Sequence, residues 1–490
     1  MQNSQDLNKV QALRDALNAG DEKRLKAQRD AGKLTARERI EKLVDAGSFV
    51  ELFALVSDSD AAAGVVTGYA TVQDRPVYLF AQDFTVKGGA MGGLQALKIN
   101  KTLDMALKTG APVLALCDSA GVRIDEGAAA MNAYAEIYRN MARLSGVVPM
   151  VAVVLGPCVG GAALLTQLAD VSIMAKNVGS LMVFGPQVLA AMNDVDVTVE
   201  ALGGADVMAR QGGVSLVAAN EHEALALTAQ VLALLPGSNV EDADLLEGDD
   251  LNRLLTVTDP ADVSGLLSQL LDAGTALELK AAYEPAVRTV MGRVGGHSVG
   301  VVATAPGTLT AGALQKAARF VHFLDCFNLP VISLINTSGV KVDRIDNQSW
   351  LMNAQSQMLY AYATATVPKL AVITGSAVGQ AYVAMGGKAN ADVAFAWPGA
   401  VVSALTPEAA VAVLYSDEVK ADSAQPAEAR AKFAKAYAED VAGALNAAKA
   451  GLVDDVIDPA QTRKLLTATL EMLVSKRDSN PAKKHGNMPL

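Results

Sequence analysis

Aromatic residues, cysteines and histidines are scarce in this chain, and positive charge is not in excess. Phe, Trp and Tyr make up 4% of the 490 residues, so small and branched aliphatic side chains and 41 glycines must build the core. Three cysteines exclude a disulfide framework, and we interpret Cys117, Cys158 and Cys326, which stand in apolar stretches, as buried core residues. A formal net charge of −11 argues against nucleic-acid binding and against a basic membrane-binding patch.

Common catalytic and metal-binding motifs are also missing. The sequence has no HExxH, no P-loop motif and no CxxC, and its four histidines are scattered, so no metal site is predicted. GHSVG at 296–300 matches the GxSxG pattern of a nucleophile elbow, but VVATAPGTLTAG follows it instead of a helix pattern, and we predict a turn there. The N-terminal MQNSQDLNKV contains no apolar run typical of a secretory signal, which favours a cytoplasmic protein.

Length and composition predict a folded protein with two domains. A chain of 490 residues is too long for one ordinary core, and 51% hydrophobic with 19% charged residues excludes disorder. The uncharged run at 144–169 is long enough to cross a membrane. Prolines and the Gly160-Gly161 pair interrupt it, and a similar run recurs at 370–387, so we interpret both as a strand, a glycine turn and a buried helix.

The second half of the sequence repeats the first. Three segments recur in the same order about 220 residues further on: LVDAGSFVEL at 43–52 as LLDAGTALEL at 270–279, CDSAGVR at 117–123 as INTSGVK at 335–341, and VPMVAVVLGPCVGGA at 148–162 as VPKLAVITGSAVGQA at 367–381. A repeat of this length is a whole domain, so we predict a tandem duplication. We place the domains at 1–245 and 246–490, with the acidic stretch 241–250 as the linker.

Strand and helix patterns alternate within a copy, which is typical of an α/β domain. In the first copy, two strands at 65–83 flank a polar Gln73-Asp74 turn, and buried strands are predicted at 111–121 and 150–155. Helices are predicted at 95–108, where leucines at 94, 97, 103 and 107 suggest the apolar face, at 131–144, at 162–168 and at both charged ends of the chain.

The best candidates for chemistry are two equivalent glycine turns, Gly156–Ala162 and Gly375–Ala381, each after a strand and before a helix. Unobstructed backbone N–H groups at a helix N-terminus form a site for an anion or a developing oxyanion. A duplicated oxyanion site suits a reaction between two carbonyl-bearing partners. Close packing of a helix on a sheet explains the same glycines and stays open as the alternative.

A charged segment follows the strand at 111–121. Asp118, Arg123, Asp125 and Glu126 either bind or orient a substrate, or belong to a helix N-terminus with acidic residues in its first turn. The residues alone leave both interpretations open.

Six further segments are distinctive: LTARERIEKLVDAGSFVEL, FAQDFTVKGGAMG, CDSAGVRIDEG, SGVVPMVAVVLGPCVGGA, AFAWPGA and KKHGNMPL. Together they resemble the carboxyltransferase subunits of biotin-dependent acyl-CoA carboxylases and decarboxylases, of the propionyl-CoA carboxylase beta and methylmalonyl-CoA decarboxylase alpha type. The similarity covers nearly the whole chain. It implies an α/β fold, a tandem duplication of two domains of the ClpP/crotonase superfamily, with the acyl-CoA side first and the biotin side second.

For activity, the resemblance implies transfer of a carboxyl group between a malonyl-type acyl-CoA, such as methylmalonyl-CoA or malonyl-CoA, and biotin. Similar enzymes hold the thioester oxygen with amides of the first turn and the biotin ureido oxygen with amides of the second. The implied positions here are Gly160 and Gly161 in the first turn, Gly379, Gln380 and Ala381 in the second, and Ala120, Gly121, Arg123 and Val383 for substrate binding. No metal and no protein base need be invoked.

The resemblance also implies partners. The chain has no Met-Lys-Met biotinylation site and no ATP-grasp signature, so biotin is expected on a separate carrier protein. A biotin carboxylase or a membrane decarboxylase subunit is expected to complete the complex. Related subunits form homo-oligomers whose sites lie between subunits.

Departures from the family pattern leave alternatives open. Gln380 stands where relatives have a second glycine, Ala120 and Val122 are larger than usual, and DNQSWLMNAQSQ at 346–357 replaces a glycine- and histidine-containing helix start. Val383 favours the decarboxylase type over a carboxylase beta subunit. A non-catalytic scaffold is a further alternative. A crotonase-like hydratase, isomerase or hydrolase would need carboxylates at the turns, where this chain has alanines.

Overall fold

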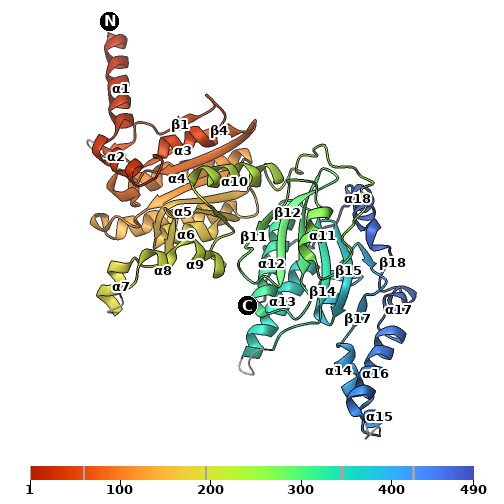
Figure 1. Cartoon of the computed structure of the whole chain (residues 1–490). Coiled ribbons are helices and arrows are strands. Elements are labelled where there is room, and N and C mark those ends of the chain that lie inside the picture. The colour runs from red at the N-terminus through yellow and green to blue at the C-terminus, as the bar shows by residue number, and fades with distance from the viewer. Residues whose placement is uncertain (1, 59–60, 194–195, 343–346, 422–424, 490) are drawn as a thin grey trace. The chain divides into compact units, whose positions relative to one another are not determined.

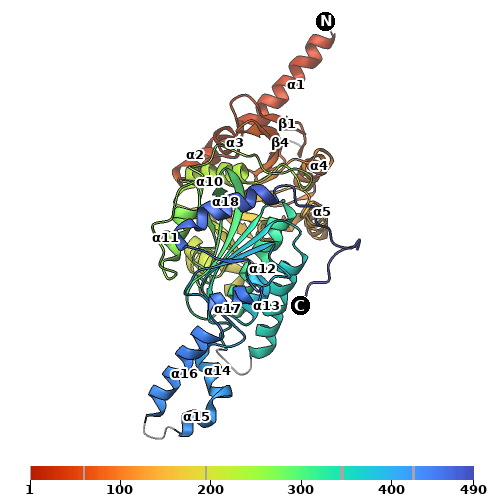
Figure 2. The ribbon, with the colours of Figure 1, turned by 90° about the vertical axis from the view of Figure 1, so that its right-hand side faces the viewer.

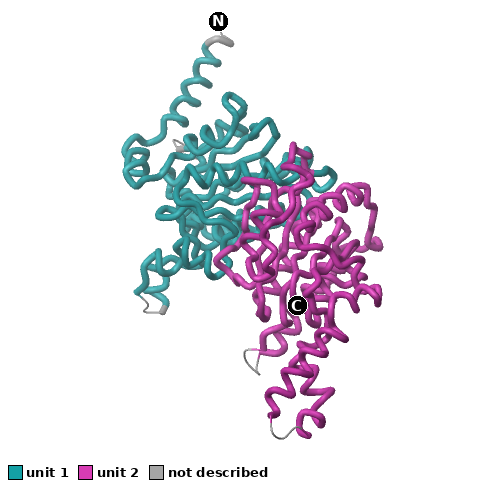
Figure 3. The backbone as a smooth tube through the Cα atoms, turned by 45° about the vertical axis from the view of Figure 1, so that its right-hand side comes forward, with its two compact units in different colours: residues 1–242 teal, residues 243–490 magenta. Residues whose placement is uncertain are grey.

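The computed structural model describes residues 2–58, 61–193, 196–342, 347–421 and 425–489; Asp346, the first residue of the altered helix start, lies outside them. The chain folds into two compact units, Met1–Asp242 and Ala243–Leu490 (Figure 3). The boundary falls in the acidic stretch 241–250, which contains no helix or strand. The assignment of an acyl-CoA half and a biotin half stays a prediction.

Unit 1 is built on one eight-stranded sheet (Figure 1). Its strands are β1 (Val50–Leu52), β4 (Val65–Val72), β5 (Arg75–Gln82), β6 (Val113–Ser119), β7 (Met150–Val159), β8 (Val171–Ala175), β9 (Ser180–Met182) and β10 (Leu216–Ala218), and β2 (Ser57–Asp58) pairs separately with β3 (Ala61–Ala62). The order is β1-β4-β5-β6-β7-β8-β10, with β9 beside β7. The first three are antiparallel and the others parallel.

The helices of unit 1 precede, connect and follow these strands. They are α1 (Gln2–Ala19), α2 (Glu22–Asp30), α3 (Ala36–Leu43), η1 (Lys87–Gly89), α4 (Gly93–Thr109), η2 (Ile124–Glu126), α5 (Ala128–Leu144), α6 (Gly161–Leu168), α7 (Pro186–Asn193), α8 (Val199–Gly203), α9 (Ala205–Arg210) and α10 (Glu221–Leu234). The parallel strands β6 and β7 are joined through α5, as parallel pairing requires.

Unit 2 has the same strand order, β11-β12-β13-β14-β15-β16-β18 with β17 beside β15. These strands are β11 (Leu277–Leu279), β12 (Val287–Val294), β13 (His297–Thr304), β14 (Val331–Thr337), β15 (Lys369–Val378), β16 (Val393–Ala396), β17 (Val401–Ser403) and β18 (Asp455–Val456). One topology used twice confirms the predicted duplication.

The helices of unit 2 are α11 (Val263–Leu270), α12 (Ala311–Cys326), α13 (Gln348–Thr364), the π-helix η4 (Tyr382–Gly386), α14 (Pro407–Leu414), α15 (Ser416–Ala421), α16 (Pro426–Asp440), α17 (Ala444–Lys449), η5 (Pro459–Gln461) and α18 (Thr462–Leu473). Helices α14, α15 and α16 form an arm beside the sheet (Figure 2). Tyr415 and Phe433 stack inside this arm, with 5.1 Å between ring centroids.

The predicted Gln73-Asp74 turn is confirmed. Both residues have positive φ, 51° and 63°, as a tight turn between twisted strands requires. The Asp45 carboxylate accepts hydrogen bonds from both of their N–H groups, at 3.0 and 2.9 Å, which stabilises this conformation. The corresponding turn in unit 2 is Gly295-Gly296, between β12 and β13. Of GHSVG, only Gly296 lies in the predicted turn, and the other four residues begin β13. The motif is therefore no nucleophile elbow, because a strand follows where an elbow needs a helix.

Three expectations about single positions were wrong. In α4 Leu103 is buried as expected, together with Ala96, Ile99 and Ala106, and Leu107 packs partly buried against the core, but Leu97 lies off this face and is 51% exposed. Cys117 and Cys158 are buried, but Cys326 is exposed near the end of α12. Strand β7 continues past Leu155 to Val159, because Pro157–Val159 pair with β9.

The long uncharged runs are interior elements. Residues 144–169 form the end of α5, strand β7 and helix α6, and the strand is almost entirely buried. Within the described part of the chain, no helix combines the length and hydrophobicity that a membrane crossing requires.

Candidate active site

The first glycine turn is a single residue between β7 and α6. Gly160 has φ 60° and ψ −118°, a conformation that residues with a Cβ rarely adopt. Its N–H donates to the Met182 carbonyl of β9 at 2.9 Å. The Gly160 amide, which was expected to hold the thioester oxygen, is therefore already bonded to a backbone carbonyl. This residue instead sets the direction of the backbone at the turn.

The next two amides are open. Gly161 and Ala162 are the first residues of α6, and a helix has no internal acceptor for its first N–H groups. Among the described residues neither N–H has a hydrogen-bond partner, whereas the Ala163 N–H donates to the Gly160 carbonyl at 3.0 Å. Two adjacent donors at a helix N-terminus can stabilise an oxyanion.

A second loop lies against this turn, at the end of β6. Ser119 pairs with Cys158, and a Cβ added to Gly121 would lie 3.1 Å from the Val159 carbonyl oxygen. The Met91 N–H donates to the Gly121 carbonyl at 2.8 Å. Within the described ranges the Val122 N–H has no partner, so an additional open amide stands in the loop beside the turn.

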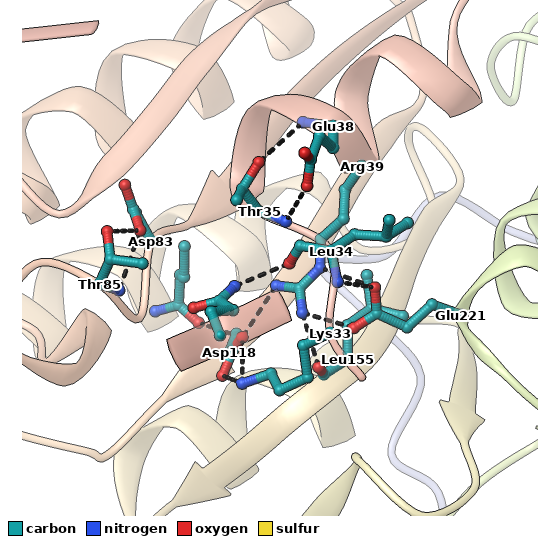
Figure 4. A network of polar contacts seen from close by, with 12 residues as sticks. Lys33, Leu34, Thr35, Glu38, Arg39, Asp83, Thr85, Asp118, Leu155 and Glu221 are labelled. Carbon is teal, nitrogen blue, oxygen red and sulfur yellow. Dashed lines mark hydrogen bonds and ion pairs between the residues drawn. The ribbon is translucent and has the colours of Figure 1, made fainter. Parts of the chain in front are cut away.

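A buried polar network holds the end of β6 (Figure 4). The Asp118 carboxylate is fully buried and accepts hydrogen bonds from Lys33 Nζ at 2.8 Å and Arg39 Nη1 at 2.9 Å. Arg39 also donates to the Leu155 carbonyl at 2.7 Å and to the Glu221 carboxylate at 2.6 Å. Burial alone would lower the pKa of Arg39, but the two carboxylates outweigh it and raise that pKa above its ordinary value.

This network gives Asp118 a structural role in place of the substrate contact considered from the sequence. A Cβ on Gly156 would collide with Asp118 Oδ1, so only glycine lets the carboxylate approach β7. Unit 2 keeps the arrangement without the charge. There Asn336 stands at the Asp118 position, and a Cβ on Gly375 would collide with its Oδ1.

The other charged candidates pair with each other. Arg123 is 5% exposed and donates to Glu126 Oε1 at 2.9 Å, while Glu126 Oε2 accepts from the Gly93 N–H at 2.8 Å at the start of α4. Asp125 is exposed. Ala120, the first residue after β6, is exposed, and its N–H donates to the Gly88 carbonyl at 2.9 Å.

The unit 2 turn repeats the first one with a different continuation. Gly379 has φ 60°, and its N–H donates to the Ser403 carbonyl at 2.8 Å. Gln380 and Ala381 follow, and neither amide has a partner among the residues described. The next residues form the π-helix η4, where Val383 is 46% exposed. The Gln380 side chain is exposed at the turn.

Sequence analysis did not predict the basic pocket that lies in unit 1. A cavity of about 450 Å³ is lined by three cationic side chains, Arg24, Lys33 and Lys87, together with Phe84 and Gly88. Gly88 links it to the candidate site through its hydrogen bond with Ala120. The basic run KRLKAQRDAGK at 23–33 was the available signal. In the described ranges, no group of three or more His, Cys, Asp or Glu side chains is arranged to hold a metal.

Comparison with known proteins gives consistent results. Residues 27–488 match the model of the carboxyl transferase domain family. The chain is 39% identical over 502 residues to the carboxyltransferase subunit of propionyl-CoA carboxylase from Haloferax mediterranei, covering 97% of each protein. It is 38% identical over 499 residues to the methylmalonyl-CoA decarboxylase subunit alpha of Veillonella parvula, covering 96% of each.

A solved structure is similar over almost its full length. The crystal structure of a transcarboxylase 12S hexamer, with hydrolysed methylmalonyl-coenzyme A bound, has a TM-score of 0.93 and 37% sequence identity to this chain. The match covers 99% of this chain and 98% of that one.

Removing the buried guanidinium tests the network beneath the turn. We expect Arg39→Met to lower the free energy of unfolding by about 3–5 kcal/mol, because Glu221 and Asp118 keep buried charges without their shared partner. Urea unfolding measures this. The control Arg29→Met breaks an exposed ion pair with Glu38 and should cost less than about 1 kcal/mol. Equal losses in the two variants would contradict a structural role for the network.

Proposed function

This chain belongs to the carboxyl transferase domain family, and from that premise we propose that it is a biotin-dependent acyl-CoA carboxyltransferase. It moves a carboxyl group between a malonyl-type acyl-CoA and biotin, with methylmalonyl-CoA and propionyl-CoA, or malonyl-CoA and acetyl-CoA, as the pairs. One observation carries the proposal: the same turn occurs twice, and each time two open amides follow a glycine whose own N–H is engaged.

On the acyl-CoA side, the open amides act on the thioester oxygen. When the carboxyl group leaves the α-carbon, the bonding electron pair moves toward that oxygen, which becomes an enolate. The N–H groups of Gly161 and Ala162 then donate to a negative charge that the ground state lacks. Fixed donors of this kind contribute about 3–4 kcal/mol each to the transition state. Gly160 holds the backbone in the required direction.

On the biotin side, the residues present fit a ureido oxygen. The N–H groups of Gln380 and Ala381 offer two donors to one acceptor, and Gly379 sets their direction as Gly160 does in unit 1. Biotin, when bound, accepts or supplies the carboxyl group at its ureido nitrogen. The exposed Gln380 side chain borders this position and limits the space around it.

The basic pocket supports an acyl-CoA substrate. Coenzyme A carries phosphate groups, and the Arg24 and Lys87 side chains supply positive charge beside the loop that contains Ala120, whereas the charge of Lys33 is balanced by Asp118. Arg123, buried and paired with Glu126, holds the start of α4 against this loop, which makes it a positioning residue in our proposal.

The partners follow from the same premise. Biotin is carried by a separate protein, and the similarity to a transcarboxylase 12S hexamer supports a homo-oligomer. Sites between its subunits are part of our proposal. Val383, exposed beside the second turn, favours the decarboxylase alpha type, in which a membrane subunit is the partner. A carboxylase beta subunit, working with a biotin carboxylase, is the alternative.

The activity is tested by decarboxylation assays on the purified chain. With free biotin present, we expect methylmalonyl-CoA or malonyl-CoA to release propionyl-CoA or acetyl-CoA, and without biotin we expect no release. Chromatography of the CoA thioesters measures both. Release that does not depend on biotin would indicate a crotonase-type decarboxylase. Silence on both substrates, with a biotinylated carrier protein also supplied, would indicate a scaffold.

A matched pair of variants distinguishes the roles of the two turns. Gly160→Ala and Gly379→Ala both force a Cβ into a positive-φ position without a close clash. We expect Gly160→Ala to lower kcat by about 100-fold through misdirected donors, and Gly379→Ala mainly to raise the KM for biotin.

The controls for this pair come from the repeat itself. Gly47→Ala and Gly274→Ala stand at equivalent positive-φ positions with open space around them, outside both turns. They should keep activity and lose only about 1–2 kcal/mol of stability from backbone strain. Similar activity losses in controls and turn variants would contradict the assignment.

A further inference from the structure

Two tyrosines on α5 lie one helical turn apart and contact both loops of the unit 1 site. Tyr134 Oη donates to the Gly121 carbonyl at 3.1 Å, and Tyr138 Oη donates to the Gly161 carbonyl at 2.8 Å. Their rings stack, with centroids 5.6 Å apart and planes inclined by 23°. One helix therefore sends a hydroxyl to each of the loops that carry open amides.

The two acceptors are not arbitrary carbonyls. The Gly121 carbonyl belongs to the same peptide group as the Val122 N–H, and the Gly161 carbonyl to the same group as the Ala162 N–H. Both of these N–H groups lack a partner among the described residues. A hydrogen bond accepted at a peptide carbonyl polarises the group and makes its N–H a stronger donor.

The Tyr134 ring also fixes the position of the turn. A Cβ on Gly161 would lie 2.7 Å from carbon atoms of this ring, so only glycine allows the turn to approach the ring this closely. Tyr134 is 2% exposed and cannot turn away. The ring sets the distance between the turn and α5, and the hydroxyls set the orientation of the two peptide planes.

Both hydroxyls remain donors at any ordinary pH. Burial raises the pKa of Tyr138 to about 12 and raises that of Tyr134 well above its ordinary value. Neither phenol ionises in the range where an acyl-CoA thioester is stable, so each keeps its proton.

Unit 2 lacks this arrangement at the corresponding loop. Gly339, the counterpart of Gly121, accepts hydrogen bonds from the Leu309 N–H at 2.9 Å and from Thr337 Oγ1 at 3.2 Å, as Gly121 does from the Met91 N–H and Ser119 Oγ. Among the described residues, no tyrosine hydroxyl adds a third bond to the Gly339 carbonyl. Helix α13 carries Tyr360 and Tyr362, and the Tyr362 hydroxyl forms a hydrogen bond with Ser333 Oγ at 3.1 Å. The loop at Gly339 therefore forms without a tyrosine hydroxyl bonded to its carbonyl.

We propose that Tyr134 and Tyr138 are positioning residues of the unit 1 oxyanion site, which polarise and orient the Val122 and Ala162 amides toward the thioester oxygen. The inference rests on the proposed function and deepens it. Because the polarised donors matter most when that oxygen carries negative charge, the hydroxyls favour the enolate over the bound substrate.

The test removes each hydroxyl and keeps each ring. For Tyr138→Phe and Tyr134→Phe we expect kcat for biotin-dependent decarboxylation to fall by about tenfold each, with KM for the acyl-CoA within about twofold of wild type. The affinity for 2-nitropropionyl-CoA, whose anion spreads its charge onto the thioester oxygen, should fall by a similar factor. The affinity for propionyl-CoA should not change.

Tyr362→Phe is the matched control. It removes a buried tyrosine hydroxyl and its hydrogen bond to Ser333 in unit 2, so it should lower the melting temperature without changing kcat. If Tyr134→Phe fails to fold, Tyr138→Phe decides, because Tyr138 is only partly buried.

The outcomes separate the inference from the proposed function. An active wild type with unchanged kcat and analogue affinity in both tyrosine variants would overturn the inference alone. If Tyr362→Phe lost as much kcat as Tyr134→Phe and Tyr138→Phe, general destabilisation would explain all three losses. That result would also overturn the inference. A wild type that neither transfers carboxyl groups nor binds the nitro analogue would overturn the proposed function and the inference together.

Discussion

The first N–H groups of a helix have no acceptor inside that helix, and the site of this protein depends on that constraint. At α6 the fold engages the Gly160 amide with β9 and leaves those of Gly161 and Ala162 open. Neighbouring side chains hold these open amides in place. The buried Arg39 and Asp118 pair fixes the end of β6, and α5 contacts the turn through Tyr134. In the proposed mechanism the open backbone N–H groups stabilise the developing oxyanion, and the side chains around them hold these groups rigidly in place.

Duplication gives the protein this constraint twice, and the copies have since diverged. Strand order, the positive-φ glycine and the open amides are the same in both units. Asp118 is replaced by Asn336, and the position that repeats Arg39 holds the buried Leu266, so these two positions carry no charge in unit 2. The helix after the turn is an α-helix in unit 1 and a π-helix in unit 2. Under the proposed function, two similar turns with different walls suit two different carbonyl partners.

Local patterns predicted most of the fold. The alternation of strands and helices and the Gln73-Asp74 turn depend on neighbouring residues, the repeat is visible by comparing the two halves of the sequence, and all three were confirmed. The errors arose where contacts with distant residues decide the structure. Pairing with β9 extends β7, and the packing of α4 and α12 leaves Leu97 and Cys326 exposed.

The candidate site shows the same division. Its turns were visible as glycines between a strand and a helix, but which amides stay open depends on acceptors in β9 and β17. The polar network joins positions 39, 118 and 221, which no local pattern connects. The tyrosine pair had a signal in the spacing of AYAEIY, where residues four apart share a helix face, but only the structure shows what that face contacts.

The central claim is that the thioester oxygen of an acyl-CoA is held by open amides of the unit 1 turn. A crystal structure of the chain with propionyl-CoA bound tests it most directly. We predict the thioester oxygen about 3 Å from the amide nitrogen of Gly161 or Ala162, with the acyl α-carbon facing solvent or the biotin carrier. A thioester oxygen bound away from this turn, with both amides still open, would contradict the account.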